Sequence, residues 1–346
     1  MKLKMLPALA GDCLEIKFDG CTPGMVIIDG GMGKECRYIL KNDVCDWKDK
    51  NGPVDLAILT HMDNDHISGF LSLIKDEKIN DEYLSEMWFN YGEKIERSVS
   101  NEKKRLYVED NSCLTSCKQG KELYEYLKIK NIPLVAPIIS GMKKQADQWC
   151  LEVISPSEEC LDEFVSSDEY QVIEDEVADL QTAARKNDYG YSVEDLLKRT
   201  FDESSVTKAN ASSVAVLASD NDHSILCLGD AKSSEVEREL RRRGYYEKNP
   251  LHVDFVKVSH HGSSHSTSGS LIRILDCRNY LISTNWKGLP TKECLARIVE
   301  NALEPVTFYC NYEPYTEIFT SDEYQKYGMQ FKNIGNMEID VSGESL

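Results

Sequence analysis

The sequence predicts a layered α/β fold built from two β-rich halves, each with helices packed on its outer side. Short apolar runs with strand-like patterns occupy both ends of the chain, and most of them end in a glycine or a polar cluster. A strongly acidic, helix-like stretch separates the two halves. Because ligand sites of layered α/β proteins gather at strand ends, the polar clusters there are the candidates for a functional site.

Composition limits the function. The chain has 346 residues, and its 41% hydrophobic content is normal for a protein with a buried core. The formal net charge is -19, which opposes non-specific binding of nucleic-acid phosphates but leaves room for a nuclease that uses metal ions. The 12 cysteines are scattered, so we expect reduced and mostly buried thiols.

The first half, residues 1–156, is expected to be rich in strands. Its N-terminus reads as a strand and a turn, because the apolar run there is short and is interrupted by Pro7. Helical apolar spacing predicts helices over residues 67–74 and near residues 120–130. Period-two or continuous apolar runs predict strands at residues 14–18, 25–28, 56–59, 87–90, 134–139 and 151–154.

Residues 157–203 are acidic and helical in pattern, as in I-E-D-E-V-A-D-L and S-V-E-D-L-L-K-R. We interpret them as an insertion, a cap or lid, in a single domain that spans residues 1–346. A solvated amphipathic face without chemistry is the plainer alternative. A protein partner that binds this insertion is a further hypothesis.

The second half, residues 204–346, returns to β structure. Ser233 or Ser234 is expected to cap the start of a helix that ends at Gly244. The three arginines 241–243 in its last turn suit the helix dipole better than they suit a phosphate site. Another helix is expected over residues 291–301, and the strands are expected at residues 213–217, 225–228, 253–258, 280–283, 306–312 and 337–341. The polar turn at residues 219–222 predicts that the first two of these strands form a hairpin.

No stretch of the sequence approaches the ~20 apolar residues of a membrane span. We therefore expect a soluble, cytoplasmic protein with no membrane partner.

The motif T-H-M-D-N-D-H at residues 60–66 follows an apolar run and contains four potential metal ligands, His61, Asp63, Asp65 and His66. They converge only if the strand gives way to a turn, because in a continued strand His66 would face the opposite side. Asp65 could instead cap the helix that follows. The density of imidazole and carboxylate groups favours a metal site.

Three more candidates follow apolar strands. Asp230 ends L-C-L-G-D, and His260 and His261 follow V-D-F-V-K-V-S. Four of the seven histidines thus stand at strand ends. A lone histidine is more often structural, but this grouping points to one shared site.

The full set of motifs resembles a known family. The sequence carries G-D-C at 11, I-I-D-G-G at 27, T-H-M-D-N-D-H at 60, N-A-S-S at 210, L-G-D at 228 and K-V-S-H-H-G-S at 257. Their order resembles the metallo-β-lactamase superfamily, and within it the hydrolase domain of the DNA-uptake protein ComEC and its soluble relatives, over roughly residues 1–290. The resemblance implies a four-layer αββα sandwich, here with the acidic helical insertion, and a two-metal site at one edge of the sheets.

The resemblance also assigns roles. The first metal would be held by His61 and Asp63, the second by Asp65 and His66, and Asp230 would bridge them. At least one of the two histidines 260 and 261 would bind metal or donate a proton, and the choice stays open. The metal-binding candidates are therefore His61, Asp63, Asp65, His66, Asp230, His260 and His261, and the catalytic candidates are Asp65, which would orient the attacking water, and His261.

Two departures from the family pattern concern the metals. The superfamily supplies another histidine between the first motif and the bridging aspartate, but the only histidine between His66 and Asp230 here is His223, in a predicted hairpin turn. Asn210 occupies the place of that histidine, as an asparagine does in the ComEC-like branch. Asp63 replaces the commoner histidine, which gives the first metal harder ligands. That favours manganese, or a weakly held exchangeable metal, over tightly held zinc.

A third departure is Leu289, which stands where ComEC-like proteins often have the histidine of G-H-P. If that histidine is the proton donor, activity would fall or change, and His265 is a possible substitute. The residues expected to support the ligands or contact substrate are Asp29, Asn210, Ser212, Ser263, His265 and Asn285.

We hypothesise a hydrolase that uses two divalent ions, Mn or Zn, and that acts as a phosphodiesterase or nuclease. A first alternative is a phosphocholine-type, small-ester or lactone hydrolase whose acidic insertion grips a cationic substrate. A second is a non-catalytic interaction module that retains the fold.

Overall fold

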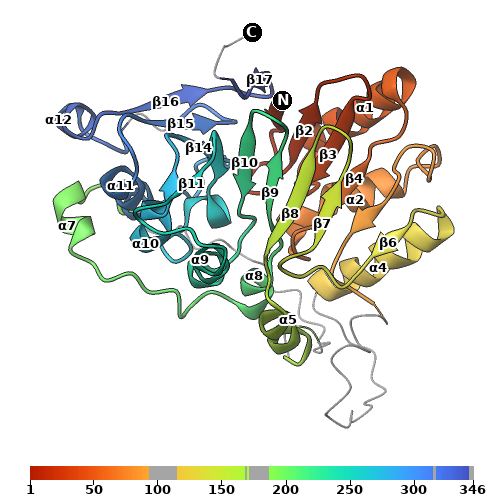
Figure 1. Cartoon of the computed structure of the whole chain (residues 1–346), viewed down its shortest axis with the longest axis horizontal. Coiled ribbons are helices and arrows are strands. Elements are labelled where there is room, and N and C mark those ends of the chain that lie inside the picture. Colours follow the sequence, from red (N-terminus) through yellow and green to blue (C-terminus); the bar gives the residue numbers. More distant parts are fainter. Residues whose placement is uncertain (93–114, 168–169, 171–186, 315–316, 343–346) are drawn as a thin grey trace.

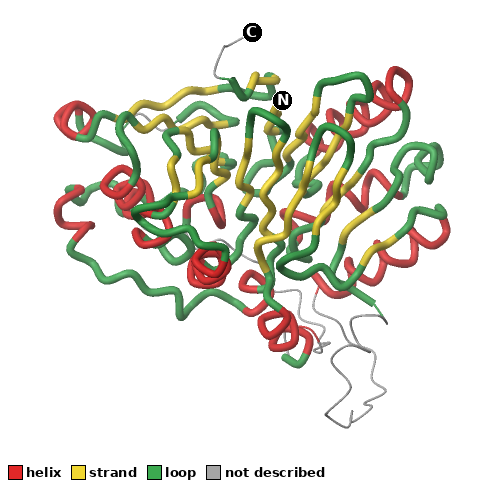
Figure 2. Tube along the Cα trace, viewed as in Figure 1, coloured by secondary structure: helices red, strands yellow, loops and turns green. Residues whose placement is uncertain are grey.

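Two β-sheets face each other in the computed structural model, and helices cover their outer sides (Figures 1 and 2). The structure describes residues 1–92, 115–167, 170, 187–314 and 317–342. The four layers predicted from the sequence are confirmed.

The first sheet is mixed and has the strand order β17-β1-β2-β3-β4-β5-β6. Strands β17, β1, β2 and β3 pair antiparallel, and β3 to β6 pair parallel. The strand bounds are β1 (Lys2–Met5), β2 (Leu14–Phe18), β3 (Gly24–Ile28), β4 (Leu56–Ile58), β5 (Met87–Trp88), β6 (Leu134–Val135) and β17 (Glu338–Asp340).

The second sheet has the order β16-β15-β14-β12-β10-β9-β8-β7. Strands β10, β12, β14, β15 and β16 are parallel neighbours, and β7 to β10 pair antiparallel. Its strands are β7 (Lys143–Gln145), β8 (Cys150–Ser155), β9 (Ala215–Ser219), β10 (Ser224–Cys227), β12 (Phe255–Lys257), β14 (Asn279–Ile282), β15 (Val306–Cys310) and β16 (Met329–Asn333), and a separate pair is formed by β11 (Leu251–His252) and β13 (Leu275–Asp276).

Three apolar layers hold the sandwich together. The layer between the sheets includes Ile16 and Val26 from the first sheet and Val216 and Phe255 from the second. A second layer lies under α1 (Lys34–Asn51), α2 (Asn64–Ile74) and α4 (Thr115–Ile129), and a third lies under α9 (Ser233–Arg242), α10 (Gly269–Arg273) and α11 (Lys292–Asn301). Burial on both sides explains the nearly continuous apolar runs of the central strands. The remaining helices are α5 (Glu158–Val165), α7 (Val193–Leu197), α8 (Lys208–Ala211), α12 (Ser321–Lys326) and the 3-10 turn η1 (Ser259–Gly262).

Most predicted elements are present, with shorter strands. The hairpin β9-β10 is confirmed, whereas helix α1 was not predicted. The cap prediction for α9 was wrong, because Lys232 occupies the N-cap position and Ser233 is already helical. In the predicted insertion the structure describes α5 and α7; residues 168–169 and 171–186 lie outside the described residues. Among the described helices, none combines the length and apolar character that crossing a bilayer requires.

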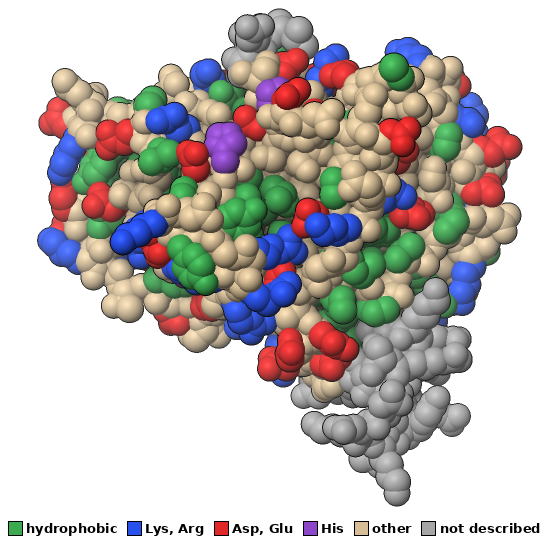
Figure 3. All heavy atoms as spheres, in the orientation of Figure 1, with side chains coloured by type: hydrophobic (Ala, Val, Ile, Leu, Met, Phe, Trp, Pro, Cys, Tyr) green, Lys and Arg blue, Asp and Glu red, His purple; other side chains and the backbone are tan. Residues whose placement is uncertain are grey.

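The arginines at the end of α9 are paired with glutamates. Arg241 bonds Glu237 and Glu247, while Arg242 and Arg243 both bond Glu239. Figure 3 shows basic side chains around α9 with acidic ones among them. The arginines therefore belong to a helix terminus with its own counter-ions, as predicted.

The carboxyl ends of β3, β4, β10, β12 and β14 meet at one edge of the sandwich, because each pairs parallel with its neighbour within its sheet. Close packing of glycines brings α2 to this edge. A Cβ atom on Gly69 would lie 1.7 Å from the carbonyl oxygen of Gly30. The amide of Gly30 in turn donates to the carbonyl of His66, at 2.8 Å.

Far from this edge, Glu15 on β2 is fully buried and both its carboxylate oxygens lack a hydrogen-bond partner. Its charged neighbours are Lys17, with Nζ 3.8 Å away, and the ion pair of Lys4 with Asp43. Burial and the charge of Asp43 raise the pKa of Glu15 to about 8, against the two lysines. Glu15 is thus neutral in the folded protein at pH 7.

We predict that Glu15 makes stability fall with rising pH. Below about pH 4.5 the folded and unfolded chains both hold this proton; between about pH 4.5 and 8 only the folded chain does, so the contribution is lost as pH rises through 8. In Glu15→Gln, the free energy of unfolding should fall by about 3 kcal/mol less between pH 5 and pH 8.5 than it does in the parent protein. Urea unfolding at pH 5 and pH 8.5 measures it, with the exposed Glu82→Gln as control. Equal pH dependence in the variant and the parent would contradict the assignment.

Candidate metal centre

The strand-to-helix turn after β4 brings the first motif together. His61 lies three residues after Ile58, the last residue of β4, and Asp63 occupies the N-cap position of α2 with extended backbone (φ −63°, ψ 146°). The side chain of Asp63 makes no capping bond. Asp65 and His66 lie in the first turn of α2, so the alternative that Asp65 caps this helix was wrong.

The second sheet contributes Asp230, His260 and His261 after β10 and β12. Gly229 has φ 52°, and a Cβ there would lie 2.5 Å from the hydroxyl of Ser213. The two histidines are consecutive residues with left-handed backbone, at φ 48° and 53°. Such conformations cost energy and are characteristic of functional sites.

Asp230 lies between four imidazoles. Its Oδ2 atom is 3.8 Å from Nε2 of His61 and 3.8 Å from Nε2 of His260. Its Oδ1 atom is 3.6 Å from Nε2 of His66 and 4.0 Å from Nε2 of His261. Each carboxylate oxygen therefore faces a different pair of histidines, and both histidines of the H-H pair reach the cluster.

Two more carboxylates complete the arrangement. Asp63 Oδ2 lies 3.6 Å from Nε2 of His61. Asp65 Oδ2 lies 3.9 Å from Nε2 of His66 and 3.5 Å from Nε2 of His261. We call His61, Asp63, His260 and Oδ2 of Asp230 the outer donor set, and Asp65, His66, His261 and Oδ1 of Asp230 the inner donor set.

These residues fit a divalent cation. Nε2 of His61, His66 and His261 and Oδ1 of Asp230 are buried and have no hydrogen-bond partner in the protein. Buried polar atoms without partners are costly, so a bound cation would stabilise the cluster. Donor separations of 3.5–4.0 Å suit ligands about 2.0–2.2 Å from a common cation.

Hydrogen bonds fix two of the imidazoles through one carboxylate. His66 Nδ1 donates to Asp29 at 2.8 Å. The hydroxyl of Thr60 donates to the same carboxylate oxygen, Oδ2 of Asp29, at 2.8 Å and accepts from Nδ1 of His61 at 3.0 Å. Both rings thus carry their proton on Nδ1 and direct Nε2 at the cluster, which is the tautomer a metal ligand needs. The supporting role expected for Asp29 matches these contacts.

The sequence interpretation missed Asp12. Donor atoms of Asp12, His66, Asp230 and His261 lie within 4.8 Å of one another. One oxygen of Asp12 is ion-paired with buried Lys257, and the other lies 3.3 Å from Nδ1 of His261, behind the ring. Asp12 therefore supports His261 from the back, together with the carbonyl of Ser283, which accepts from Nδ1 at 3.0 Å. The G-D-C motif was the available signal.

Charge within the cluster sets its protonation before any cation binds. Burial lowers the pKa of His261, but Asp12 and Asp230 outweigh burial and raise it to about 10. Burial likewise opposes the charge of His66, yet Asp29 and Asp230 hold its pKa well above the usual value. Burial by itself would raise the pKa of Asp230, but the surrounding histidines outweigh burial and hold the pKa well below its usual value. A cation would replace these protons as the counter-charge.

Of the remaining predicted residues, Asn210 is buried, and its amide nitrogen lies 3.4 Å from Nδ1 of His260. Ser212 instead donates to the carbonyl of Ala209, and Asn285 accepts from the amide of Lys287. Neither of these two contacts involves a donor residue. The neighbouring Ser213 is the serine that reaches the centre.

Ser213 accepts a hydrogen bond from the amide of Asp230 at 3.0 Å, and its hydroxyl is 3.5 Å from Nδ1 of His61. The N-A-S-S motif thus contributes its second serine to the site. Sequence alone did not distinguish the two serines.

Ser263 and His265 line a cavity of about 430 Å³. Ser263 lies two residues after His261 in the sequence. Arg199 and Glu293 lie in the same wall and pair at 3.0 Å, so their charges offset each other. His265 Nδ1 donates to the carbonyl of Asp202 at 2.7 Å. None of the donor residues is among its described lining, but Ser263 links it to the turn that carries His261, and this cavity is therefore the candidate substrate site.

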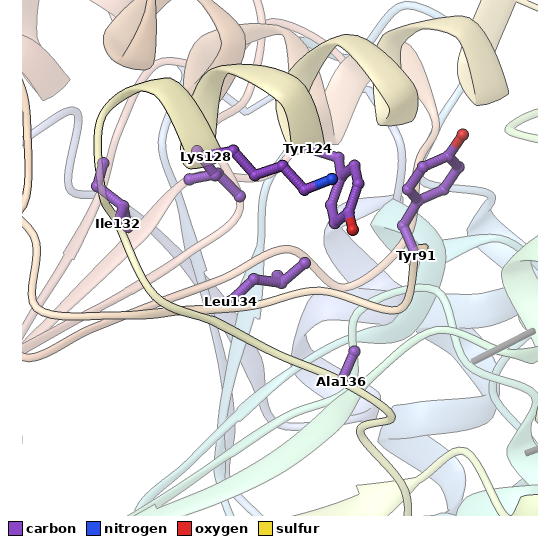
Figure 4. Close-up of a pocket in the computed structure, with 7 residues that line it drawn as sticks. Tyr91, Tyr124, Lys128, Ile132, Leu134 and Ala136 are labelled. Atoms are coloured by element: carbon purple, nitrogen blue, oxygen red, sulfur yellow. The ribbon is translucent and has the colours of Figure 1, made fainter. Parts of the chain in front are cut away.

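Another cavity, of about 190 Å³, lies between α4 and the segment around β6 (Figure 4). Its described lining is mostly apolar and includes Tyr91, Tyr124 and Leu134. Lys128 Nζ lies 3.9 Å from the centre of the Tyr124 ring. Its described lining includes neither the donor residues nor residues next to them in sequence, so this cavity is not a candidate for the substrate site.

The sequence model of the metallo-beta-lactamase superfamily matches residues 24–141. That match covers about a third of the chain, and the two mixed sheets flanked by helices are the fold of that superfamily. A buried His and Asp cluster in this fold indicates a metal-dependent hydrolase.

Among curated proteins, none matches the sequence. Among solved structures, the metallo-beta-lactamase fold protein YhfI from Bacillus subtilis is 8% identical, with a TM-score of 0.44, over 91% of this chain and 97% of its own. Zn(2+)-bound PqqB from Methylobacterium extorquens is 7% identical, with a TM-score of 0.43, over 98% of this chain and 100% of its own.

We predict that Lys257→Met destabilises the protein by about 3–5 kcal/mol, because it leaves the buried carboxylate of Asp12 without its counter-charge. Adding Asp12→Asn should recover a large part of the loss. Urea unfolding of metal-free protein measures both. As a matched control, Lys198→Met breaks the exposed pair with Asp195 and should change stability by less than about 1 kcal/mol. A double variant as unstable as Lys257→Met would contradict the pairing.

Proposed function

We propose that this chain is a ComEC-like phosphodiesterase that uses two divalent cations, one at each donor set, with Asp230 between them. The observation that carries the proposal is the set of buried donor atoms without hydrogen-bond partners, three imidazole nitrogens and one carboxylate oxygen, aimed at one volume. A pair of bound divalent ions would activate a water molecule and stabilise charge on the attacked phosphoryl group.

Side chains of this protein would hold the two cations and orient the attacking water. Asp230 faces both donor sets with separate oxygens, which supports a bridging role. Asp65, whose side chain is 31% exposed, is the donor of the inner set that reaches solvent, which supports a role in orienting the attacking water and accepting its proton. His261 is buried and bonded at Nδ1, which favours a ligand role over proton donation to a leaving group.

Charge around the candidate substrate site favours a small diester over a long nucleic acid. Among the described residues, the carboxylates of the two donor sets pair with histidines, and the supporting carboxylate of Asp12 pairs with buried Lys257. In the cavity wall Arg199 is offset by Glu293. With a net charge of -19, the protein offers little to hold a long phosphate backbone. The phosphoryl group would therefore be bound mainly at the metal centre.

His265 is the residue that we propose as proton donor to the leaving group. It would take the role of the family histidine whose position Leu289 occupies in this chain. It lies four residues after His261 and lines the candidate substrate cavity, and its Nδ1 is bonded to a carbonyl, which leaves Nε2 for proton transfer.

The second candidate is a phosphocholine-type esterase. Asp188 and Glu293 both line the cavity, and acidic side chains attract cationic groups. Both carboxylates have partners, however, since Asp188 caps α11 and Glu293 pairs with Arg199. The same assay separates the two candidates.

We predict that the chain loaded with Mn²⁺ or Zn²⁺ hydrolyses bis(p-nitrophenyl) phosphate, and that His66→Ala and Asp65→Ala each lower kcat/KM at least about 100-fold, or about 2.7 kcal/mol of transition-state stabilisation. The matched control is His252→Ala, at an exposed histidine on β11 that pairs with Asp276. It should retain full activity. Single-stranded DNA, RNA and a choline-bearing diester complete the substrate panel.

Faster hydrolysis of the choline-bearing diester than of the other substrates would favour the phosphocholine-type esterase. No hydrolysis by protein that carries two metals per chain would sink the catalytic proposal. Such a result would favour the non-catalytic module.

A further inference from the structure

The two donor sets differ in the groups behind their imidazoles. In the inner set, His66 Nδ1 donates to the carboxylate of Asp29 at 2.8 Å. Behind His261 lie the carbonyl of Ser283 at 3.0 Å and the carboxylate of Asp12 at 3.3 Å. An anionic partner at the back of the ring makes the imidazole more basic and holds it in place, and both effects strengthen metal binding.

In the outer set the partners are neutral. His61 Nδ1 bonds the hydroxyl of Thr60 at 3.0 Å. Nδ1 of His260 faces the hydroxyl of Ser266 at 3.3 Å and the amide of Asn210 at 3.4 Å. The outer imidazoles are therefore weaker ligands than the inner ones.

Asn210 has a specific relation to His260. Its Oδ1 atom is buried without a hydrogen-bond partner, while its nitrogen points at Nδ1 of His260. Turning the amide end for end places Oδ1 where it accepts from Nδ1–H and satisfies both groups. His260 then directs a free Nε2 at Asp230. Asn210 stands where the superfamily has a metal-binding histidine. Here it would act indirectly, by orienting the ring of His260.

Solvent exposure differs in the same direction. The carboxylate side chains of Asp63 in the outer set and Asp65 in the inner set are 42% and 31% exposed. The imidazoles differ through one residue: outer His260 is 31% exposed, whereas outer His61 and the inner His66 and His261 are at most 3% exposed. Water screens the attraction between a cation and exposed donors far more than between a cation and buried ones.

We propose that the centre is graded: the inner set holds a resident cation, the outer set takes a second, exchangeable cation, and Asn210 is the positioning residue that sets the affinity of the outer set. This inference rests on the two-metal centre proposed above. It makes the availability of a divalent metal a regulator, because the chain passes between one-metal and two-metal forms as the metal concentration changes.

Equilibrium dialysis of the metal-free full chain against Zn²⁺, and separately against Mn²⁺, followed by metal analysis, tests the proposal. We expect two dissociation constants at least about tenfold apart. Asn210→Ala should weaken only the weaker site, by about tenfold, whereas Asn210→Asp, which puts a carboxylate behind His260, should strengthen only that site. The matched control Asn285→Ala removes an amide that serves a local turn and should change neither constant.

The gain in Asn210→Asp separates positioning from structural damage, because a damaged fold does not bind metal more tightly. His260→Ala provides a second variant, which should keep the tight ion and lose the weak one. Equal constants, only one ion per chain at saturation, or an Asn210 variant that changes the tight constant would overturn the inference. Graded binding without hydrolysis would leave it standing and remove the proposed function, and hydrolysis with equal constants would do the reverse.

Discussion

One buried carboxylate organises the candidate site. Asp230 is 2% exposed and has a histidine pair facing each of its two oxygens. A carboxylate and four imidazoles in so dry a volume are stable only with protons or cations to balance them. Exclusion of water makes unbalanced charges in the cluster costly. It also strengthens the attraction between these donors and a bound divalent ion. The contacts of Asp12, Asp29, Thr60 and Ser213 with these residues all serve to direct donor atoms toward that volume.

The fold meets this requirement by bringing two sheets to one edge. The first sheet supplies a strand-to-helix turn and the second supplies two parallel strand ends. Both depend on local backbone features that few residues tolerate. Gly30 and Gly69 allow α2 to approach the turn after β3, and the left-handed pair His260 and His261 turns both imidazoles to the cluster. The cost of these conformations is offset by the apolar layers on both sides of each sheet.

The sequence predicted what depends on local pattern. The layers, the hairpin β9-β10 and the convergence of the first motif all follow from apolar period and turn residues. Helix α1 was missed although its buried residues Cys36, Leu40, Val44 and Trp47 have helical spacing. Its many polar residues dilute that signal.

The rest of the site depends on contacts between residues far apart in sequence. Asp12 and Lys257 are 245 residues apart, and no local pattern shows that they pair behind His261. The choice between Ser212 and Ser213, and the inclusion of both histidines of the H-H pair, were set by backbone direction, which a motif does not encode. Asp63 remained the residue that distinguishes the outer set, but His260 gives that set two imidazoles where the sequence interpretation counted one.

The central claim is that Asp230 lies between two cations held by different histidine pairs. The most direct measurement is a crystal structure of the Mn²⁺-loaded protein with anomalous diffraction collected at the manganese edge. The account predicts two anomalous peaks, one beside each carboxylate oxygen of Asp230, with His66 and His261 at one and His61 and His260 at the other. A single peak ligated by Asp12, or no peak within the cluster, would contradict it.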